Sequence, residues 1–245
     1  MAERTEHLAQ RRLRTPRTAA IAGILFALLF GTSWLLIRPA LPAETLEPSA
    51  WLEQRAKHLS LAMSLIPFAG IAFLWFMGVV RDRMGRQEDQ FFSTLFFGSG
   101  YLYLGMTFAS AAMIGGALVL YASDLDLLSG SGVYSLALVV SNRLNTVYAM
   151  RMAGAFMFVL GTIWVRTGVM PRWLALVTYL LAAVLLISIG FFRWVVLVFP
   201  AWVLIISLAI MVLNYRRTHE REGQDGLTVV DQTPTGSNWQ GDKQT

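Results

Sequence analysis

The chain has 245 residues, of which 56% are hydrophobic and 14% charged, with a net charge of +5 and no cysteine. Soluble domains average about 25% charged residues, so this composition indicates a membrane protein. Without cysteine the chain cannot form disulfides, iron–sulfur clusters or thiolate sites. We predict no soluble domain that could carry a nucleic-acid-binding patch, and attribute the basic excess to loops retained in the cytoplasm.

The first 17 residues form a basic segment, and an apolar run over 18–37 follows. This run exceeds the 7–15 apolar residues typical of a signal peptide, so we predict an uncleaved first span. Small residues recur in it at every fourth position, a pattern that lets helix backbones approach closely. This helix-packing stripe consists of Ala19, Gly23, Ala27 and Gly31. We expect it to join helices of one bundle; the alternative is an interface with a second copy or another protein.

The next two spans are predicted over 59–80, where Pro67 should produce a kink, and over 91–121. The latter is longer than the roughly 20 residues that a crossing needs, which predicts tilting, bending or extension beyond the bilayer. A flexible Ser-Gly loop containing Asp124 and Asp126 follows. Residues 133–140 are apolar but too few to span, and could form an interfacial helix or extend the next span.

The last three spans are predicted over 147–165, 171–190 and 194–215, followed by a disordered polar tail over 216–245. The sequence thus predicts an all-α, polytopic bundle of six transmembrane helices over 18–215. With the N-terminus inside, 14 Lys and Arg residues are cytoplasmic and six are external. The positive-inside rule therefore predicts a protein of the cell (inner) membrane with both termini in the cytoplasm. Tryptophans near the span ends are expected in the aromatic belts: Trp34, Trp75, Trp164, Trp173 and Trp194.

The predicted spans contain no Asp, Glu or His, so we predict no catalytic, cofactor or metal site within the bilayer. The one ionisable residue there is Arg151, about one turn inside the outer end of the fourth span. A pocket for a carboxylate, a phosphate or a lipid headgroup is one interpretation, with contributions from Asn142, Arg143, Asn145 and Tyr148. The alternative is an arginine that snorkels to the interface or pairs with Asp124 or Asp126.

The turn Arg166-Thr-Gly-Val-Met-Pro-Arg-Trp173 resembles the turn between the fourth and fifth spans of a bacterial six-span membrane family called domain of unknown function 4386. The order of spans and loops over residues 18–214 is also similar. Gly168 is suited to end one helix and Pro171 to start the next. The resemblance implies a six-span fold but no activity, since none is established for that family.

Three functions are compatible with these features. The first is a non-enzymatic accessory protein, scaffold or binding component, whose partners are membrane lipids, a second copy or another membrane protein, without nucleic acid or metal. The second is a transporter or channel for a small anionic or lipidic solute, with Arg151 in the site and flexible points at Pro67 and Pro200. The third is an enzyme acting on lipid at the outer interface, using the loop residues Glu44, Glu53, His58, Asp124 and Asp126.

Overall fold

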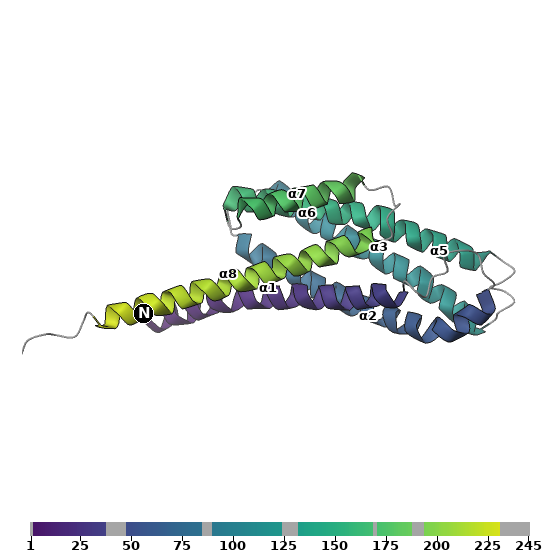
Figure 1. Cartoon of the computed structure of the whole chain (residues 1–245), viewed down its shortest axis with the longest axis horizontal. Helices are drawn as coiled ribbons and strands as arrows, with labels where there is room; N and C mark the ends of the chain where they lie inside the picture. The colour runs from purple at the N-terminus through teal and green to yellow at the C-terminus, as the bar shows by residue number, and fades with distance from the viewer. Residues whose placement is uncertain are drawn as a thin grey trace, which may run out of the picture.

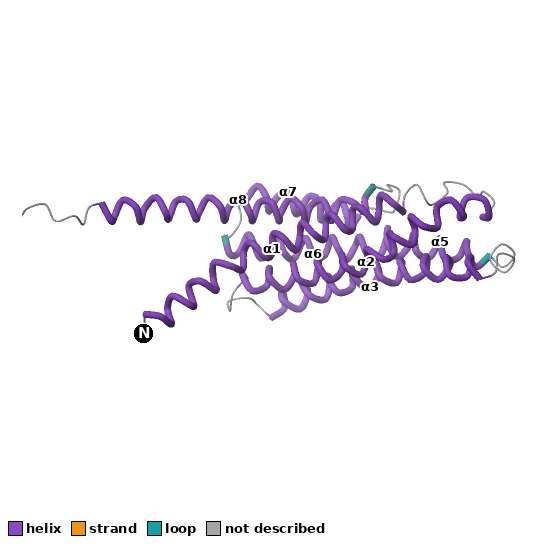
Figure 2. Tube along the Cα trace, turned by 90° about the horizontal axis from the view of Figure 1, so that it is seen from below, coloured by secondary structure: helices purple, strands orange, loops and turns teal. Residues whose placement is uncertain are grey.

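The computed structural model describes residues 2–37, 48–84, 90–123, 132–168, 171–187 and 194–230. Within these ranges the protein contains helices and no strand, which confirms the all-helical class (Figure 2). Figure 1 shows the helices as one elongated bundle. The elements are α1 (Ala2–Ile37), α2 (Pro48–Met84), α3 (Gln90–Ser123), α5 (Val133–Arg143), η2 (Leu144–Ala149), α6 (Met150–Thr167), α7 (Arg172–Ile187) and α8 (Val195–Val230).

Among the described residues, five helical segments are long and apolar enough to cross a membrane: Thr18–Ile37, Lys57–Arg81, Gln90–Leu120, Ser135–Thr167 and Val195–Val212. The apolar helix α7 is shorter, with 16 residues. At 1.5 Å per residue it is about 24 Å long, against a hydrocarbon core of about 30 Å. Length and composition therefore define a multi-pass helical membrane protein with five long apolar helices and one short one.

The fourth long segment runs through three elements without a break. The α-helix α5, the π-helix η2 and the α-helix α6 follow one another directly from Val133 to Thr167, and Figure 1 shows α5 and α6 in line. The apolar run 133–140 therefore continues the helix of the fourth predicted span and is not a separate helix. Arg151 lies near the middle of this long helix, because the helix begins well before residue 147, the predicted start of the span. The polar residues at 142–145 resemble a boundary in the sequence, but the helix continues through them.

The two terminal helices are longer than the apolar runs inside them. Helix α8 continues to Val230, whereas the sequence predicted a disordered tail from residue 216; residues 231–245 lie outside the described ranges. Arg, Glu and Gln favour helices, and extending an existing helix is easier than starting one, which explains the continuation. The start of α1 and the end of α8 project from the same end of the bundle (Figure 1) and diverge from each other (Figure 2).

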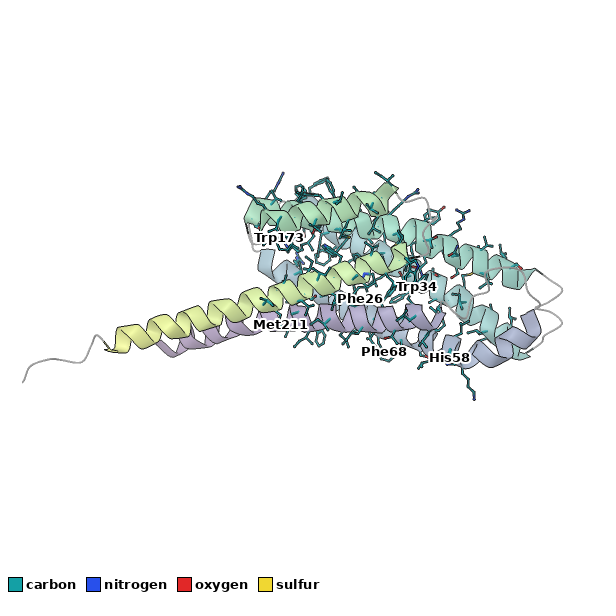
Figure 3. The ribbon with its side chains drawn as sticks, in the orientation of Figure 1. Phe26, Trp34, His58, Phe68, Trp173 and Met211 are labelled. Atoms are coloured by element: carbon teal, nitrogen blue, oxygen red, sulfur yellow. The ribbon has the colours of Figure 1, made fainter. Side chains whose placement is uncertain are left out.

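The centre of the bundle is a cluster of aromatic side chains around Phe73 of α2. Its ring centroid lies 4.9 Å from that of Phe26, 5.4 Å from Phe156 and 5.5 Å from both Tyr103 and Phe199. These rings come from α1, α2, α3, α6 and α8, so the cluster joins five helices. Figure 3 shows Phe26 within the bundle and Phe68 and Trp173 at its margins.

Close helix contacts form where a glycine faces a neighbouring helix. A Cβ atom added to Gly23 of α1 would overlap with Ser207 of α8 and lie 3.0 Å from the Phe76 ring of α2. One added to Gly154 of α6 would lie 3.0 Å from the carbonyl oxygen of Ala182 in α7. Ala19 and Ala27 of the stripe are also buried, but Gly31 is half-buried and has open space around its Cα.

The turn after α6 has the predicted geometry. Gly168 follows the helix with φ of 62°, a left-handed conformation that glycine adopts easily, and its N–H donates to the Trp164 carbonyl over 3.0 Å. Pro171 directly precedes α7, and its carbonyl accepts a hydrogen bond from the N–H of Leu174 over 3.0 Å. The expected helix-ending and helix-starting roles of Gly168 and Pro171 are confirmed.

Candidate functional site

A cavity of about 210 Å³ lies between α1, α2, α3 and the α5–η2 segment. It is at the end of the bundle opposite the N-terminus, because it includes the last turn of α1 and the first half of the long helix 133–167. All thirteen residues that line it are uncharged: Trp34, Ile37, Met63, Ile66, Thr107, Ser110, Ala111, Ile114, Leu138, Val139, Ser141, Asn142 and Asn145.

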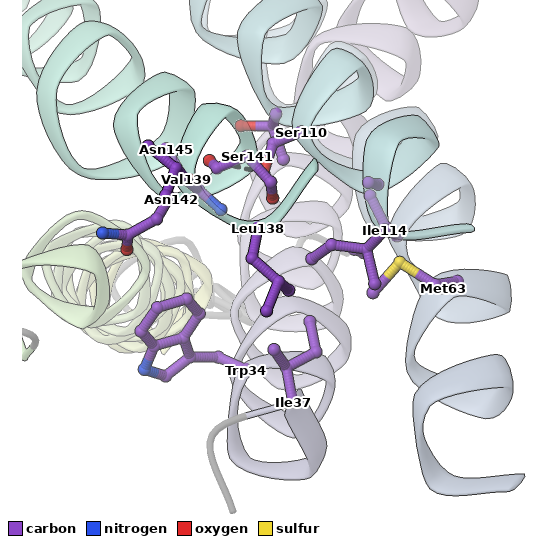
Figure 4. Close-up of a pocket in the computed structure, with 13 residues that line it drawn as sticks. Trp34, Ile37, Met63, Ser110, Ile114, Leu138, Val139, Ser141, Asn142 and Asn145 are labelled. Atoms are coloured by element: carbon purple, nitrogen blue, oxygen red, sulfur yellow. Dashed lines mark hydrogen bonds between the residues drawn. The ribbon is translucent and has the colours of Figure 1, made fainter. Parts of the chain in front are cut away.

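The cavity has a polar end and an apolar end. Figure 4 shows Ser110, Ser141, Asn142 and Asn145 gathered at one end, and Ile37, Met63 and Ile114 away from them. At the polar end α3 and α5 are joined by two hydrogen-bond contacts of Ser110. Its Oγ lies 2.7 Å from Oγ of Ser141 and donates to the Ser141 carbonyl over 3.0 Å. This pairing fixes one wall of the cavity.

Three of the lining residues carry buried polar atoms that have no hydrogen-bond partner among the described residues. They are Nε1 of Trp34, Oγ1 of Thr107 and Oδ1 of Asn145. Leaving such an atom unpaired costs about 1–3 kcal/mol, and nearly all buried polar atoms in proteins are paired with protein groups or ordered water. Three of them around one cavity indicate a site that a ligand or water completes.

Asn145 belongs to the π-helix η2, and such single π turns in long helices often occur at functional sites. The polar residues around it also bond to their own helix: Thr146 Oγ1 donates to the Asn142 carbonyl over 2.7 Å. Side chains of this type compete with regular backbone bonding. The π-helix therefore lies between α5, which lines the cavity, and α6, which packs in the core of the bundle.

The predicted site residues do not form one pocket. Asn142 and Asn145 line the cavity, whereas Arg143, Tyr148 and Arg151 do not. Arg143 and Tyr148 are exposed, and Arg151 is half-buried on α6 one turn before Gly154, which lies against α7. Asp124 and Asp126, the suggested partners of Arg151, lie outside the described residues. Contact of Arg151 with a lipid headgroup stays a prediction.

Of the groups suggested for acid–base chemistry, the structure describes only the side chain of His58, which does not line the cavity. His58 is exposed on α2, while Glu44, Asp124 and Asp126 lie outside the described ranges, as does the side chain of Glu53. Within the described part of the chain no group of three or more His, Cys, Asp or Glu side chains could hold a metal ion. The described side chains around the cavity are therefore apolar groups and neutral hydrogen-bonding groups.

The fold and the cavity together define a class: a multi-pass, all-helical membrane protein with an uncharged cavity at one end of its bundle. Comparison of the chain with protein-family models, with curated proteins and with solved structures finds no match. The resemblance of the 166–173 turn to the six-span family therefore stays a prediction.

Proposed function

We propose that the chain crosses the cell membrane six times, with α7 as the fifth span and both termini in the cytoplasm. The distribution of 14 Lys and Arg residues inside and six outside supports this orientation. An even number of spans agrees with the start of α1 and the end of α8 lying at the same end of the bundle (Figure 1). A helix as short as α7 can cross if the bilayer thins locally, at a modest cost per ångström.

Labelling of single introduced cysteines tests this topology, and the absence of native cysteine makes the label specific. On intact cells we expect a membrane-impermeant maleimide to label Ser129→Cys, and to label Ser237→Cys only after permeabilisation. If α7 does not cross, the tail lies outside and both positions are labelled in intact cells. That result would overturn the six-span proposal.

We further propose that the protein is a non-enzymatic component that binds an uncharged membrane lipid in the cavity. The observation that carries this proposal is the set of three unpaired buried polar atoms in a lining without charged residues. Drug-sized ligands occupy pockets of about 300–1,000 Å³, whereas this cavity has about 210 Å³. It therefore suits one end of an amphipathic molecule whose remainder stays in the bilayer.

The polar end of the cavity lies about one membrane thickness from Arg166 along the helix. If Arg166 marks the inner boundary of the hydrocarbon core, Asn145 lies 21 residues away along the helix, or about 32 Å. The core is about 30 Å thick, so the polar end of the cavity falls at the outer interface. A carrier for an anionic solute would place a cation there, and all thirteen lining residues are uncharged.

A matched pair of substitutions on α3 tests lipid binding. Ala111 lines the cavity, whereas its neighbour Ala112 is exposed and does not. In full-length protein reconstituted with photoactivatable neutral lipids, we expect crosslinks on cavity residues. Ala111→Trp should remove most of them by filling the cavity, and Ala112→Trp should retain them. Equal crosslinking at the cavity in both variants would refute the proposal.

A further inference from the structure

We infer that the bound lipid carries a free, uncharged hydroxyl group and that Asn145 selects for it. This inference rests on the lipid binding proposed above and specifies its chemistry. A long-chain alcohol and a diacylglycerol share this chemistry, since each presents one hydroxyl beside apolar chains.

The unpaired atoms of the lining require both a donor and an acceptor. Indole Nε1 of Trp34 can only donate, and Oδ1 of Asn145 can only accept, while the hydroxyl of Thr107 does either. All three are buried without a hydrogen-bond partner among the described residues. A hydroxyl group both donates and accepts, whereas an ester or quinone oxygen only accepts. An acceptor-only ligand would therefore leave Oδ1 of Asn145 unpaired.

The lining also disfavours a phospholipid headgroup. A phosphate taken out of water needs a cation or several donors to compensate its desolvation. Arg143, which directly follows Asn142 in the sequence, does not line the cavity, and none of the thirteen lining residues is charged. The two serine hydroxyls of the polar end already contact each other at 2.7 Å. A neutral headgroup of hydroxyl size fits these conditions.

The apolar part of the lipid has a route out of the cavity between α1 and α5. Helix α1 packs mainly against α2 and α8, and α5 packs mainly against α3, while α1 and α5 share no extensive contact. Trp34 of α1 and Val139 of α5 both line the cavity, and Val139 is 59% exposed. Acyl chains leaving the cavity here would lie against the exposed side chain of Val139.

The experiment compares photoactivatable diacylglycerol with its O-methyl ether, which keeps the acceptor and loses the donor. In wild-type protein we expect the free hydroxyl to crosslink on the order of tenfold more efficiently, the effect of about one hydrogen bond. Asn145→Leu should reduce the ratio to near one. Tyr148→Phe, in the same π-helix but outside the cavity, should keep the wild-type ratio.

The outcomes separate this inference from the proposed function. Equal crosslinking of diacylglycerol and its ether at the cavity of wild-type protein would overturn the hydroxyl requirement and leave lipid binding intact. Absence of cavity crosslinks with every neutral lipid would overturn both and indicate a water-filled cavity. Competition by a long-chain alcohol but not by its methyl ether would support the hydroxyl requirement with a single-chain ligand. Because the wild-type comparison needs no variant, a folding defect of Asn145→Leu cannot obscure the result.

Discussion

Replacing Phe73 by alanine is expected to lower the free energy of unfolding by about 3 kcal/mol, the largest effect that we predict for one substitution. Phe73 is fully buried, and five aromatic rings lie within 6.2 Å of its ring centroid. Truncating a buried Phe costs about 3–5 kcal/mol in soluble proteins. We expect the lower end of that range because lipid is as apolar as the core, so that lost packing dominates the cost.

The matched control is Phe68→Ala on the same helix, because Phe68 is 61% exposed and lies on the outside of the bundle (Figure 3). It should change the free energy of unfolding by less than about 0.5 kcal/mol. Denaturation of both variants in mixed detergent micelles, followed by tryptophan fluorescence, measures the difference. Equal losses at the two positions would contradict the five-helix aromatic cluster.

The first apolar run shows what hydropathy alone predicts well. The predicted span 18–37 coincides with the segment Thr18–Ile37, because about 20 apolar residues are required for a crossing. The fourth predicted span, 147–165, covers only part of the apolar helical segment Ser135–Thr167. Asn142, Arg143 and Asn145 interrupt its apolar run, yet a helix satisfies its backbone internally and can continue past such residues.

The cavity could not be assembled from sequence because its residues come from separate helices. A helix that is apolar on all sides gives no periodic pattern to show which residues face its neighbours. Trp34 was assigned to the aromatic belt for its place near a span end, but its side chain lines the cavity. Trp164, assigned to the belt for the same reason, is buried with its ring 6.0 Å from that of Trp202.

Of the residues predicted to form a pocket with Arg151, only Asn142 and Asn145 line the cavity. Both were chosen as neighbours of Arg151, on the argument that charge in a membrane marks function. The structure instead gathers neutral polar side chains, such as Thr107 and Ser110, which are common in membrane helices and carry no distinctive sequence signal. Whether such a side chain has a hydrogen-bond partner on a neighbouring helix, as Ser110 does, or has none among the described residues, as with Thr107, can be seen only in the assembled bundle.

Replacing Gly23 by alanine is expected to lower the free energy of unfolding by about 2 kcal/mol, within the range typical of overpacking. The added methyl group would overlap with Oγ of Ser207 and lie 3.2 Å from its Cβ and 3.0 Å from the Phe76 ring. Ser207 is fully buried, so α1 and α8 would have to separate. Adding Ser207→Ala removes the overlapping oxygen, and the double variant should recover about 1 kcal/mol, a coupling that a double-mutant cycle measures.

Gly31 provides the control on the same small-residue stripe. A Cβ atom added there meets no atom within 4 Å, and alanine favours a helix over glycine by up to about 1 kcal/mol. Gly31→Ala should therefore be neutral or stabilising, whereas Gly23→Ala destabilises. A shared sign at the two positions would show that the stripe does not contact α8 as described. If both variants also shifted the protein between oligomeric states in detergent, the stripe would instead be an interface with a second copy, the alternative that its spacing allows.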